Sequence, residues 1–247
     1  MAEIVYGRNP VLEALKARLK FDKILIAETQ EGTRISEILA RAKNAGIYVH
    51  RVPLQKIIAI TGDVATQGVI GFVHTQSYAA VEDILTKSQK LQEPPLLALL
   101  DGLEDPHNLG AILRAADGAG FHGLILPKHR SVGLSGTVAK TSAGAVAHVP
   151  VAQVTNLNQC IEELKEKNIW IVGADQAAKQ PFYEADLSGA LGIVIGGEGK
   201  GLHRLVKEKC DFLIKVPMFG RVNSLNASVA AAIIFFEARR QRLKIQG

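Results

Sequence analysis

Polar side chains that could bind a ligand or assist a proton transfer gather in residues 223–228, which read NSLNAS. Four amide and hydroxyl groups lie in this short stretch: Asn223, Ser224, Asn226 and Ser228. An apolar run, VAAAIIFF, follows directly and predicts a buried helix. Such a helix needs one polar cap, and Asn223 or Ser224 could provide it. The remaining polar groups exceed what one cap requires, so the stretch taken alone is either an overdetermined helix start or part of a binding or catalytic site.

Two further polar clusters follow predicted strands. In residues 101–120, DGLEDPHNLGAILRAADGAG, Asn108 is placed to cap a helix and Arg114 projects from its second turn. In residues 193–202, IVIGGEGKGL, four glycines surround Glu198 and a lysine. Glycine lets a backbone approach a ligand closely. Taken singly, these clusters are also compatible with a capped helix carrying a surface arginine and with a tight turn.

The glycine cluster does not match the common nucleotide-binding loops. A phosphate-binding loop needs GxxxxGK followed by Ser or Thr, whereas here Gly201 follows the lysine and position 194 is Val. The glycines follow the order G-x-x-G-x-G instead of the dinucleotide order G-x-G-x-x-G. The clusters also contain no Ser-His-Asp set, HExxH pair or CxxC motif. Acyl transfer by a triad and metal-dependent hydrolysis therefore have little support.

The clusters are positioned by elements that alternate between strand and helix. Five apolar segments predict strands: residues 96–103, 123–127, 169–175, 191–197 and 212–218. Helical patterns lie between them and after the last one. Continuous Val, Ile and Leu strands alternating with helices predict a mostly parallel sheet that is covered on both faces. Ligands bind at the carboxyl ends of such strands, and the three clusters lie at these ends.

The N-terminal part predicts a separate, smaller α/β unit. Residues 1–75 alternate helix and strand signals, beginning with a helix capped by Asn9 with Pro10 in its first turn. Residues 76–95 are polar, end in two prolines and allow one helical turn, so we interpret them as a linker. The expected organisation is a small domain over 1–75, a linker over 76–95 and a larger domain over 96–247.

Composition is that of an ordinary globular protein, with 47% hydrophobic residues among 247. The net charge of +5 is spread over both halves and permits a nucleic-acid partner without requiring one. The N-terminus does not read as a secretory signal, and the longest apolar runs are shorter than the roughly 20 residues of a membrane span. Cys160 and Cys210 read as small buried hydrophobes. We therefore expect a cytoplasmic protein without a membrane partner.

In this order and spacing, the three clusters resemble the motifs of the SpoU (TrmH-type) family of RNA ribose 2′-O-methyltransferases, within the SPOUT superfamily. The segments are DPHNLGAILRAADGAGF, IVIGGEGKGL and VPMFGRVNSLNASVAAAI, and the resemblance covers about residues 96–240. KTSAGA at 140–145 is also similar to the family. The N-terminal segments YGRNPVLEAL and QGVIGF resemble the family's L30e-like substrate-binding domain. The arrangement is most similar to the branch that methylates a guanosine ribose in 23S ribosomal RNA.

The resemblance implies an α/β fold with a C-terminal trefoil knot, a homodimer, and S-adenosylmethionine as the cofactor. The positions that match the family's catalytic residues are Asn108, Arg114, Glu198, Ser224 and Asn226. The positions expected to bind the cofactor are Gly196, Gly197, Val216, Met218 and Leu225. No metal is implied.

Two roles for Arg114 stay open. The family's proposed role is a base that activates the ribose hydroxyl, but a guanidinium is effectively always protonated in proteins. Binding the target phosphate and stabilising developing negative charge suits arginine better. Ser224 and Asn226 could orient Arg114 or relay the proton, and Glu198 could hold amide or ribose donors.

Three alternatives remain at this point. The chain could be a transfer RNA 2′-O-methyltransferase of the same family, although the N-terminal domain favours ribosomal RNA. It could be an RNA-binding protein without catalysis, which the intact motif positions argue against. A nucleotide-dependent metabolic enzyme would need a phosphate loop that the sequence does not contain.

Overall fold

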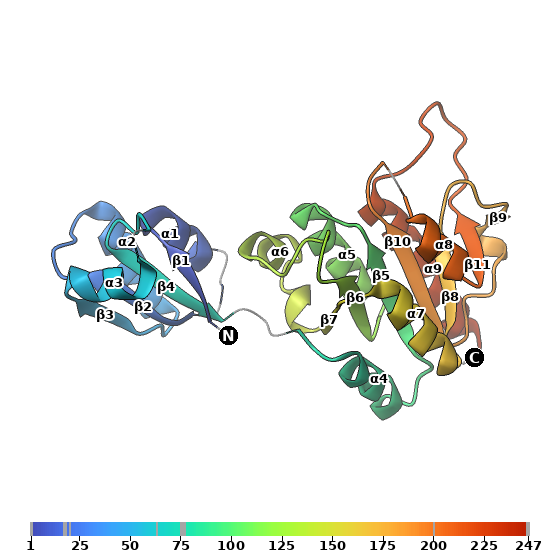
Figure 1. Cartoon of the computed structure of the whole chain (residues 1–247), viewed down its shortest axis with the longest axis horizontal. Coiled ribbons are helices and arrows are strands. Elements are labelled where there is room, and N and C mark those ends of the chain that lie inside the picture. The colour runs from blue at the N-terminus through green and yellow to red at the C-terminus, as the bar shows by residue number, and fades with distance from the viewer. Residues whose placement is uncertain are drawn as a thin grey trace. The chain divides into compact units, whose positions relative to one another are not determined.

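The computed structural model describes residues 2–16, 19, 21–62, 64–74, 78–199 and 201–245. Residues 75–77, at the expected junction of the first domain and the linker, and Lys200 of the glycine cluster lie outside the described residues. The chain divides into two compact units (Figure 1). One comprises residues 1–77 with 134–140, and the other comprises 78–133 with 141–247.

The N-terminal unit is built on a mixed four-stranded sheet with the order β1-β4-β2-β3. Its strands are β1 (Ala2–Tyr6), β2 (Phe21–Ala27), β3 (Val49–Val52) and β4 (Val69–His74). Strand β4 is antiparallel to β1 and β2, whereas β2 and β3 are parallel. The helices are α1 (Arg8–Lys16), α2 (Thr33–Asn44) and α3 (Leu54–Thr61). Strand β1 was not predicted, and α1 begins one residue before Asn9, the predicted cap.

Helices cover both faces of this sheet. Apolar residues of α1 and α2 form one core with alternate residues of β2: Val11, Leu12, Ile35 and Ile38 with Ile24 and Ile26. On the other face, Ile57 of α3 packs with Leu25, Val52 and Ile70. The alternation along β2 sends successive side chains to opposite faces, so both of its faces are buried.

The C-terminal unit contains a seven-stranded parallel sheet with the order β7-β6-β5-β10-β8-β11-β9. The strands are β5 (Leu96–Asp101), β6 (Gly123–Pro127), β7 (Val151–Val154), β8 (Trp170–Ala174), β9 (Gln180–Pro181), β10 (Leu191–Gly196) and β11 (Phe212–Lys215). The predicted parallel α/β sheet is confirmed, although the short strands β7 and β9 were missed. Strand β10 lies between β5 and β8, so the ends of β5 and β10 are neighbours.

Two layers of helices enclose the sheet (Figure 1). The helices are α4 (Val81–Lys90), α5 (Pro106–Gly118), α7 (Leu157–Glu166), α8 (Arg204–Lys209) and α9 (Ala227–Ile245), with short 3-10 helices at Ala145–Ala147 and Phe182–Glu184. Helix α6 (Gly136–Thr141) lies almost wholly in residues 134–140, which group with the N-terminal unit. One core joins α4, α7 and α8 to β5 and β10 through Ile84, Ile161, Val206, Leu97 and Val194. Helices α5 and α9 pack against each other, and the Phe121 and Phe235 rings lie 4.1 Å apart at this packing. The threading of the chain into a knot stays a prediction.

Residues 78–95, interpreted from the sequence as linker, are packed into the C-terminal unit. They contain the whole of α4, and Ile84 on this helix is fully buried in the core. Ala79 N donates to Val151 O at 2.8 Å, which ties the segment to β7. The physical reason is an amphipathic pattern in which Val81, Ile84 and Leu85 lie on one face among polar neighbours.

Candidate active site

Asn108 lies in the first turn of α5 and is 4% exposed. The prediction that Asn108 caps this helix is wrong, because Asp105 is the cap and its Oδ1 accepts from His107 N at 2.9 Å. Pro106 occupies the first helical position, where a missing N–H costs nothing, so the helix begins earlier than expected. The Asn108 amide is therefore free to bond outside its own helix.

Asn226 is the residue that caps α9. Its Oδ1 accepts from Ser228 N at 2.9 Å, from Ser228 Oγ at 2.6 Å and from Val229 N at 3.4 Å. The expectation that Asn223 or Ser224 provides the cap is wrong. The reason is that the helix starts at Ala227, so only Asn226 is adjacent to the unpaired N–H groups of the first turn.

Asn108, Glu198 and Asn226 come from three separate segments and form one closed hydrogen-bonded group. Asn108 Nδ2 donates to Glu198 Oε1 at 2.7 Å, and Asn226 Nδ2 donates to the same oxygen at 2.6 Å. Asn226 Nδ2 also lies 2.9 Å from Asn108 Oδ1. A carboxylate only accepts hydrogen bonds, so both amide nitrogens face Glu198. This group connects the segments that follow β5, β10 and β11 at the carboxyl edge of the sheet.

The glycines at the end of β10 bring backbone against backbone. A Cβ atom at Gly197 would lie 2.2 Å from Gly102 O, and one at Gly196 would lie 2.3 Å from the carbonyl carbon of Gly201. Neither position can hold a side chain without moving the main chain. Gly201 N donates to Gly197 O at 3.1 Å and closes the loop on itself. Glu198 is therefore presented from a tight turn directly after the strand.

Arg114 and Ser224 are not joined to this group. Both side chains are exposed, and among the described residues neither has a hydrogen bond or ion pair. Arg114 is six residues beyond Asn108 on α5, which places it about 9 Å along the axis and on a different side of the helix. The expectation that Ser224 and Asn226 orient Arg114 is therefore not met within one copy of the chain.

The remaining positions expected to bind a cofactor lie near the carboxyl edge beyond β11. Val216, Met218 and Leu225 are each half-buried, between the exposed loop and the core. Val216 O accepts from Gln176 Nε2 at 3.1 Å, which fixes the start of the loop to the end of β8. The sequence reasoning missed Gln176, whose position directly after a predicted strand was the available signal.

Asp101 and His203 were also missed. The buried Asp101 carboxylate accepts from His203 N at 2.7 Å, and its other oxygen lies 2.8 Å from His203 Nδ1. Asp101 ends β5 in the first polar cluster, and His203 directly follows the glycine cluster. Their positions at the margins of two motifs were the signal that could have identified them.

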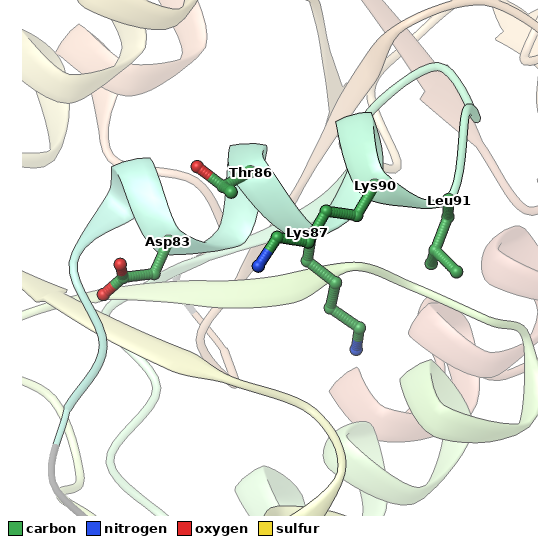
Figure 2. A pocket seen from close by; sticks show the side chains of 5 residues that line it. All are labelled: Asp83, Thr86, Lys87, Lys90 and Leu91. Carbon is green, nitrogen blue, oxygen red and sulfur yellow. The ribbon is translucent and has the colours of Figure 1, made fainter.

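A shallow hollow on the surface lies along α4, away from these residues. Figure 2 shows its lining side chains, all on or directly after α4: Asp83, Thr86, Lys87, Lys90 and Leu91. Two of its charged groups already have partners, because Asp83 accepts from Ala80 N and Lys87 donates to His148 O. In the described part of the chain, no group of His, Cys, Asp and Glu side chains could bind a metal ion. None of the helices described there is long and apolar enough to cross a membrane.

Residues 95–236 match the SpoU rRNA Methylase family, and residues 4–79 match a family described as RNA 2′-O ribose methyltransferase substrate binding. The chain belongs to the SpoU (TrmH) family of RNA methyltransferases.

Known proteins support this membership over the whole chain. YacO from Bacillus subtilis, named as a TrmH family tRNA/rRNA methyltransferase, is 47% identical over 241 residues, which are 97% of this chain and 96% of YacO. An AdoMet-bound rRNA methyltransferase from Sinorhizobium meliloti is 27% identical, with a TM-score of 0.64 over 97% of this chain and 87% of that one. A TrmH/SpoU tRNA modifying enzyme from A. aeolicus is 27% identical, with a TM-score of 0.57, over 66% of this chain and 86% of that one.

Proposed function

We propose that this protein transfers a methyl group from S-adenosylmethionine to the 2′-hydroxyl of a ribose, with a guanosine of 23S ribosomal RNA as the favoured target. The observation that carries the proposal is the hydrogen-bonded group of Asn108, Glu198 and Asn226. Each member comes from a different motif segment, and the three converge where parallel α/β sheets bind their ligands.

The residues at the carboxyl edge fit the cofactor. Gly196 and Gly197 pack against the backbones of Gly201 and Gly102, and this close packing shapes the tight turn that begins the expected cofactor loop. Val216, Met218 and Leu225 are half-buried and add apolar contacts and further backbone groups. We propose that these five positions hold S-adenosylmethionine. When bound, its sulfonium supplies an electrophilic methyl group, so the protein need only bind, orient and manage a proton.

In this proposal, Asn108 and Asn226 fix the Glu198 carboxylate, which has further acceptor capacity for a ribose hydroxyl. Two amide donors converge on Oε1, and no hydrogen bond among the described residues uses Glu198 Oε2, which can therefore accept from the substrate. Holding the 2′-hydroxyl in line with the methyl group would account for a large part of the rate. Ser224, two residues before Asn226, is exposed, and we propose that its Oγ relays the hydroxyl proton to solvent.

Arg114 is proposed to bind the phosphate next to the target ribose and to stabilise negative charge on the reacting oxygen. Its exposed guanidinium, without a carboxylate partner among the described residues, suits an incoming phosphate. Replacement by Ala would then abolish methyl transfer and leave cofactor binding, measured by calorimetry, largely intact. Arg114→Lys tests whether positive charge alone is sufficient, because a lysine retains a point charge for the phosphate but loses the bidentate hydrogen-bond geometry. A mutant Arg114→Ala as active as the wild type would remove Arg114 from the mechanism.

A homodimer is proposed to complete the site. Helix α9 exposes three apolar side chains at seven-residue spacing, Val229, Phe236 and Leu243, which lie on one side of the helix. Phe236 also lies against α5, because a Cβ atom at Gly118 would be 3.2 Å from its ring. A second copy on this stripe would approach the helix that carries Arg114. Sedimentation of Phe236→Glu as a monomer, against a wild-type dimer, is the expected result.

Ribosomal RNA is favoured over transfer RNA by the domain organisation. Residues 4–79 match a substrate-binding family, and the ribosomal RNA methyltransferase from S. meliloti aligns with nearly the whole chain. The tRNA modifying enzyme aligns with only 66% of it. We propose that the N-terminal unit, over about residues 1–75, recognises the RNA.

The test uses RNA from a strain that lacks the gene, so that the target ribose is unmethylated. Purified protein, tritiated S-adenosylmethionine and separated 23S, 16S and transfer RNA are incubated, and methylated nucleosides are identified after digestion. We expect 2′-O-methylguanosine in 23S RNA alone. Label only in transfer RNA would show that transfer RNA is the substrate. No label in any fraction would favour an RNA-binding protein without catalysis.

A further inference from the structure

Asp101, the last residue of β5, holds both ends of the loop that carries Glu198. At the start of the loop, Gly197 N donates to the Asp101 backbone carbonyl at 2.8 Å. At its end, His203 N donates to Asp101 Oδ2 at 2.7 Å, and His203 Nδ1 lies 2.8 Å from Oδ1. We propose that Asp101 and His203 are positioning residues that fix Glu198 for methyl transfer, a role that rests on the function proposed above.

The Asp101 carboxylate is buried, so its charge depends on the hydrogen bonds that it accepts. The residue is 5% exposed, whereas the His203 side chain is 51% exposed. A buried carboxylate is costly unless it accepts hydrogen bonds. A carboxylate only accepts, so His203 Nδ1 carries the proton and donates to it. The imidazole therefore covers the buried carboxylate. If the ring moved away, the carboxylate would be exposed to water or would lose a hydrogen-bond donor.

Glycine packing reinforces these bonds at both ends of the loop. Gly197 rests on Gly102 O, where a Cβ atom would be only 2.2 Å away. The His203 ring rests on Gly102, where a Cβ atom would lie 2.9 Å from Cε1. Gly102 also has a φ of +69°, which a glycine adopts at little cost. Because Gly102 has no side chain, both ends of the Glu198 loop can pack closely against it.

This arrangement bears on Glu198 because its hydrogen bonds tolerate little displacement. Glu198 Oε1 accepts from two nitrogens at 2.7 and 2.6 Å. An outward shift of about 1 Å would take both beyond ordinary hydrogen-bond distance. Glu198 directly follows the tethered Gly197, so freeing the loop at either end widens the range of positions open to its carboxylate. Misplacement of this size can cost about a hundredfold in rate.

The experiment is a double-mutant cycle on methyl transfer, measured as kcat with both substrates saturating. Asp101→Ala removes both side-chain bonds to His203, Glu198→Gln changes the carboxylate itself, and the third variant combines them. If Asp101 acts through Glu198, we expect each single change to lower kcat by about 10- to 100-fold. The double variant should lie within about threefold of the slower single variant, because coupled residues are not additive.

A conservative variant of Asp101, a variant of its partner His203 and a matched control accompany the cycle. Asp101→Asn can accept from His203 N and donate to Nδ1 once the ring proton moves to Nε2, so it should restore most of the activity. His203→Ala keeps the backbone bond but uncovers the buried carboxylate, and it should lower kcat by about 10-fold. In Asp211→Ala the lost carboxylate also holds a backbone N–H, that of Ile171 at 2.7 Å, and a cation, Lys165. Asp211 lies at the opposite edge of the sheet, and its loss should leave kcat unchanged.

The outcomes separate the two proposals. If the wild-type protein transfers no methyl group to any RNA, the proposed function fails and the positioning role with it. If the wild type is active but the effects of Asp101→Ala and Glu198→Gln multiply, only the positioning role is overturned. Should Asp101→Ala fail to fold, the same cycle is run with His203→Ala, and multiplication there overturns the proposal equally.

Discussion

Asn226 donates its side-chain amide to Glu198 Oε1 at 2.6 Å, while the carbonyl oxygen of the same side chain caps α9. One residue therefore connects the start of the last helix to the carboxylate at the end of β10. The two halves of the amide have separate tasks, because only the oxygen can accept from the helix and only the nitrogen can donate to Glu198. Helix capping and site geometry can consequently be separated by mutation.

Asn226→Ser tests this separation. Serine caps helices nearly as well as asparagine, so the change of cap should alter the free energy of unfolding by only a few tenths of a kcal/mol, and any larger loss of stability comes from the lost bond to Glu198. The donor to Glu198 is lost, however, and a hydrogen bond to a charged group is worth about 1.5–3 kcal/mol. We expect methyl transfer to fall roughly 10- to 100-fold, measured as kcat/KM, with stability followed by urea unfolding.

Asn156→Ser is the matched control for this change. Asn156 caps α7 through Oδ1, which accepts from Asn158 N at 3.0 Å and Gln159 N at 3.3 Å. It makes the same kind of cap without the Glu198 contact, so its replacement should leave activity unchanged. Equal losses of activity in the two variants would mean that the Asn226 amide has no role beyond capping.

Sequence patterns were sufficient for the architecture because the parallel strands are nearly continuous apolar runs. Strands β5 and β10 were predicted from such runs, and the rule about carboxyl ends correctly placed Asn108, Glu198 and Asn226 together. The caps were misplaced because several polar residues next to each helix start could serve equally well. Which one does so depends on where packing ends the preceding loop.

The short elements and long-range tethers were beyond sequence reasoning for a different reason. Strand β9 has two residues and pairs with its neighbour β11, and so short an element leaves no periodic signal. The bond between Asp101 and His203 joins residues 102 positions apart. No local preference encodes such a pair, which exists only because β10 is inserted beside β5.

Gly197→Ala should disturb both folding and function. The added Cβ would lie 2.2 Å from a backbone oxygen, Gly102 O, so main chain must move. Forcing atoms into a packed site costs about 1–3 kcal/mol, and the shift displaces the turn that carries Glu198. We expect a fall of that size in the free energy of unfolding, together with weaker S-adenosylmethionine binding by calorimetry.

Gly189→Ala provides the comparison within the same unit. Gly189 precedes β10, its φ is not left-handed, and a Cβ atom added to it would meet no atom within 4 Å beyond its chain neighbours. Its replacement should change stability by no more than about 0.5 kcal/mol and leave cofactor binding unaltered. Wild-type behaviour of Gly197→Ala would show that the loop can relax and that backbone contact at this glycine is not needed.

The thiols of Cys160 and Cys210 should be inert in the folded protein. Burial raises the pKa of both to about 12, and Cys210 Sγ also contacts Val206 O at 3.3 Å. The thiolate is the reactive form, so reaction at pH 8 should be roughly a thousandfold slower than for an ordinary thiol. Ellman's reagent should find both cysteines only after unfolding in guanidinium. Rapid release of colour from the native protein would contradict their burial.

His122 should make stability depend on pH below neutrality. It is 1% exposed, its Nδ1 accepts from Leu96 N at 2.9 Å, and its Nε2 lies 3.6 Å from Glu93 Oε2. Burial lowers its pKa from 6.5 to about 4, with Arg242 and Arg239 nearby also disfavouring the charged form and Glu93 opposing them. Between these two values the unfolded chain binds the proton and the folded chain does not. Stability from this group is therefore complete above pH 6.5 and is lost as pH falls towards 4.

The size of the effect can be isolated with His122→Asn, whose oxygen can still accept from Leu96 N but which does not titrate. Between pH 7 and pH 5, the wild-type free energy of unfolding should fall by about 2 kcal/mol more than that of the variant. Urea unfolding of both proteins across this range gives the difference directly, because all other titrating groups are shared. Parallel curves for the two proteins would mean that His122 takes up its proton in the folded state and is not held neutral by burial.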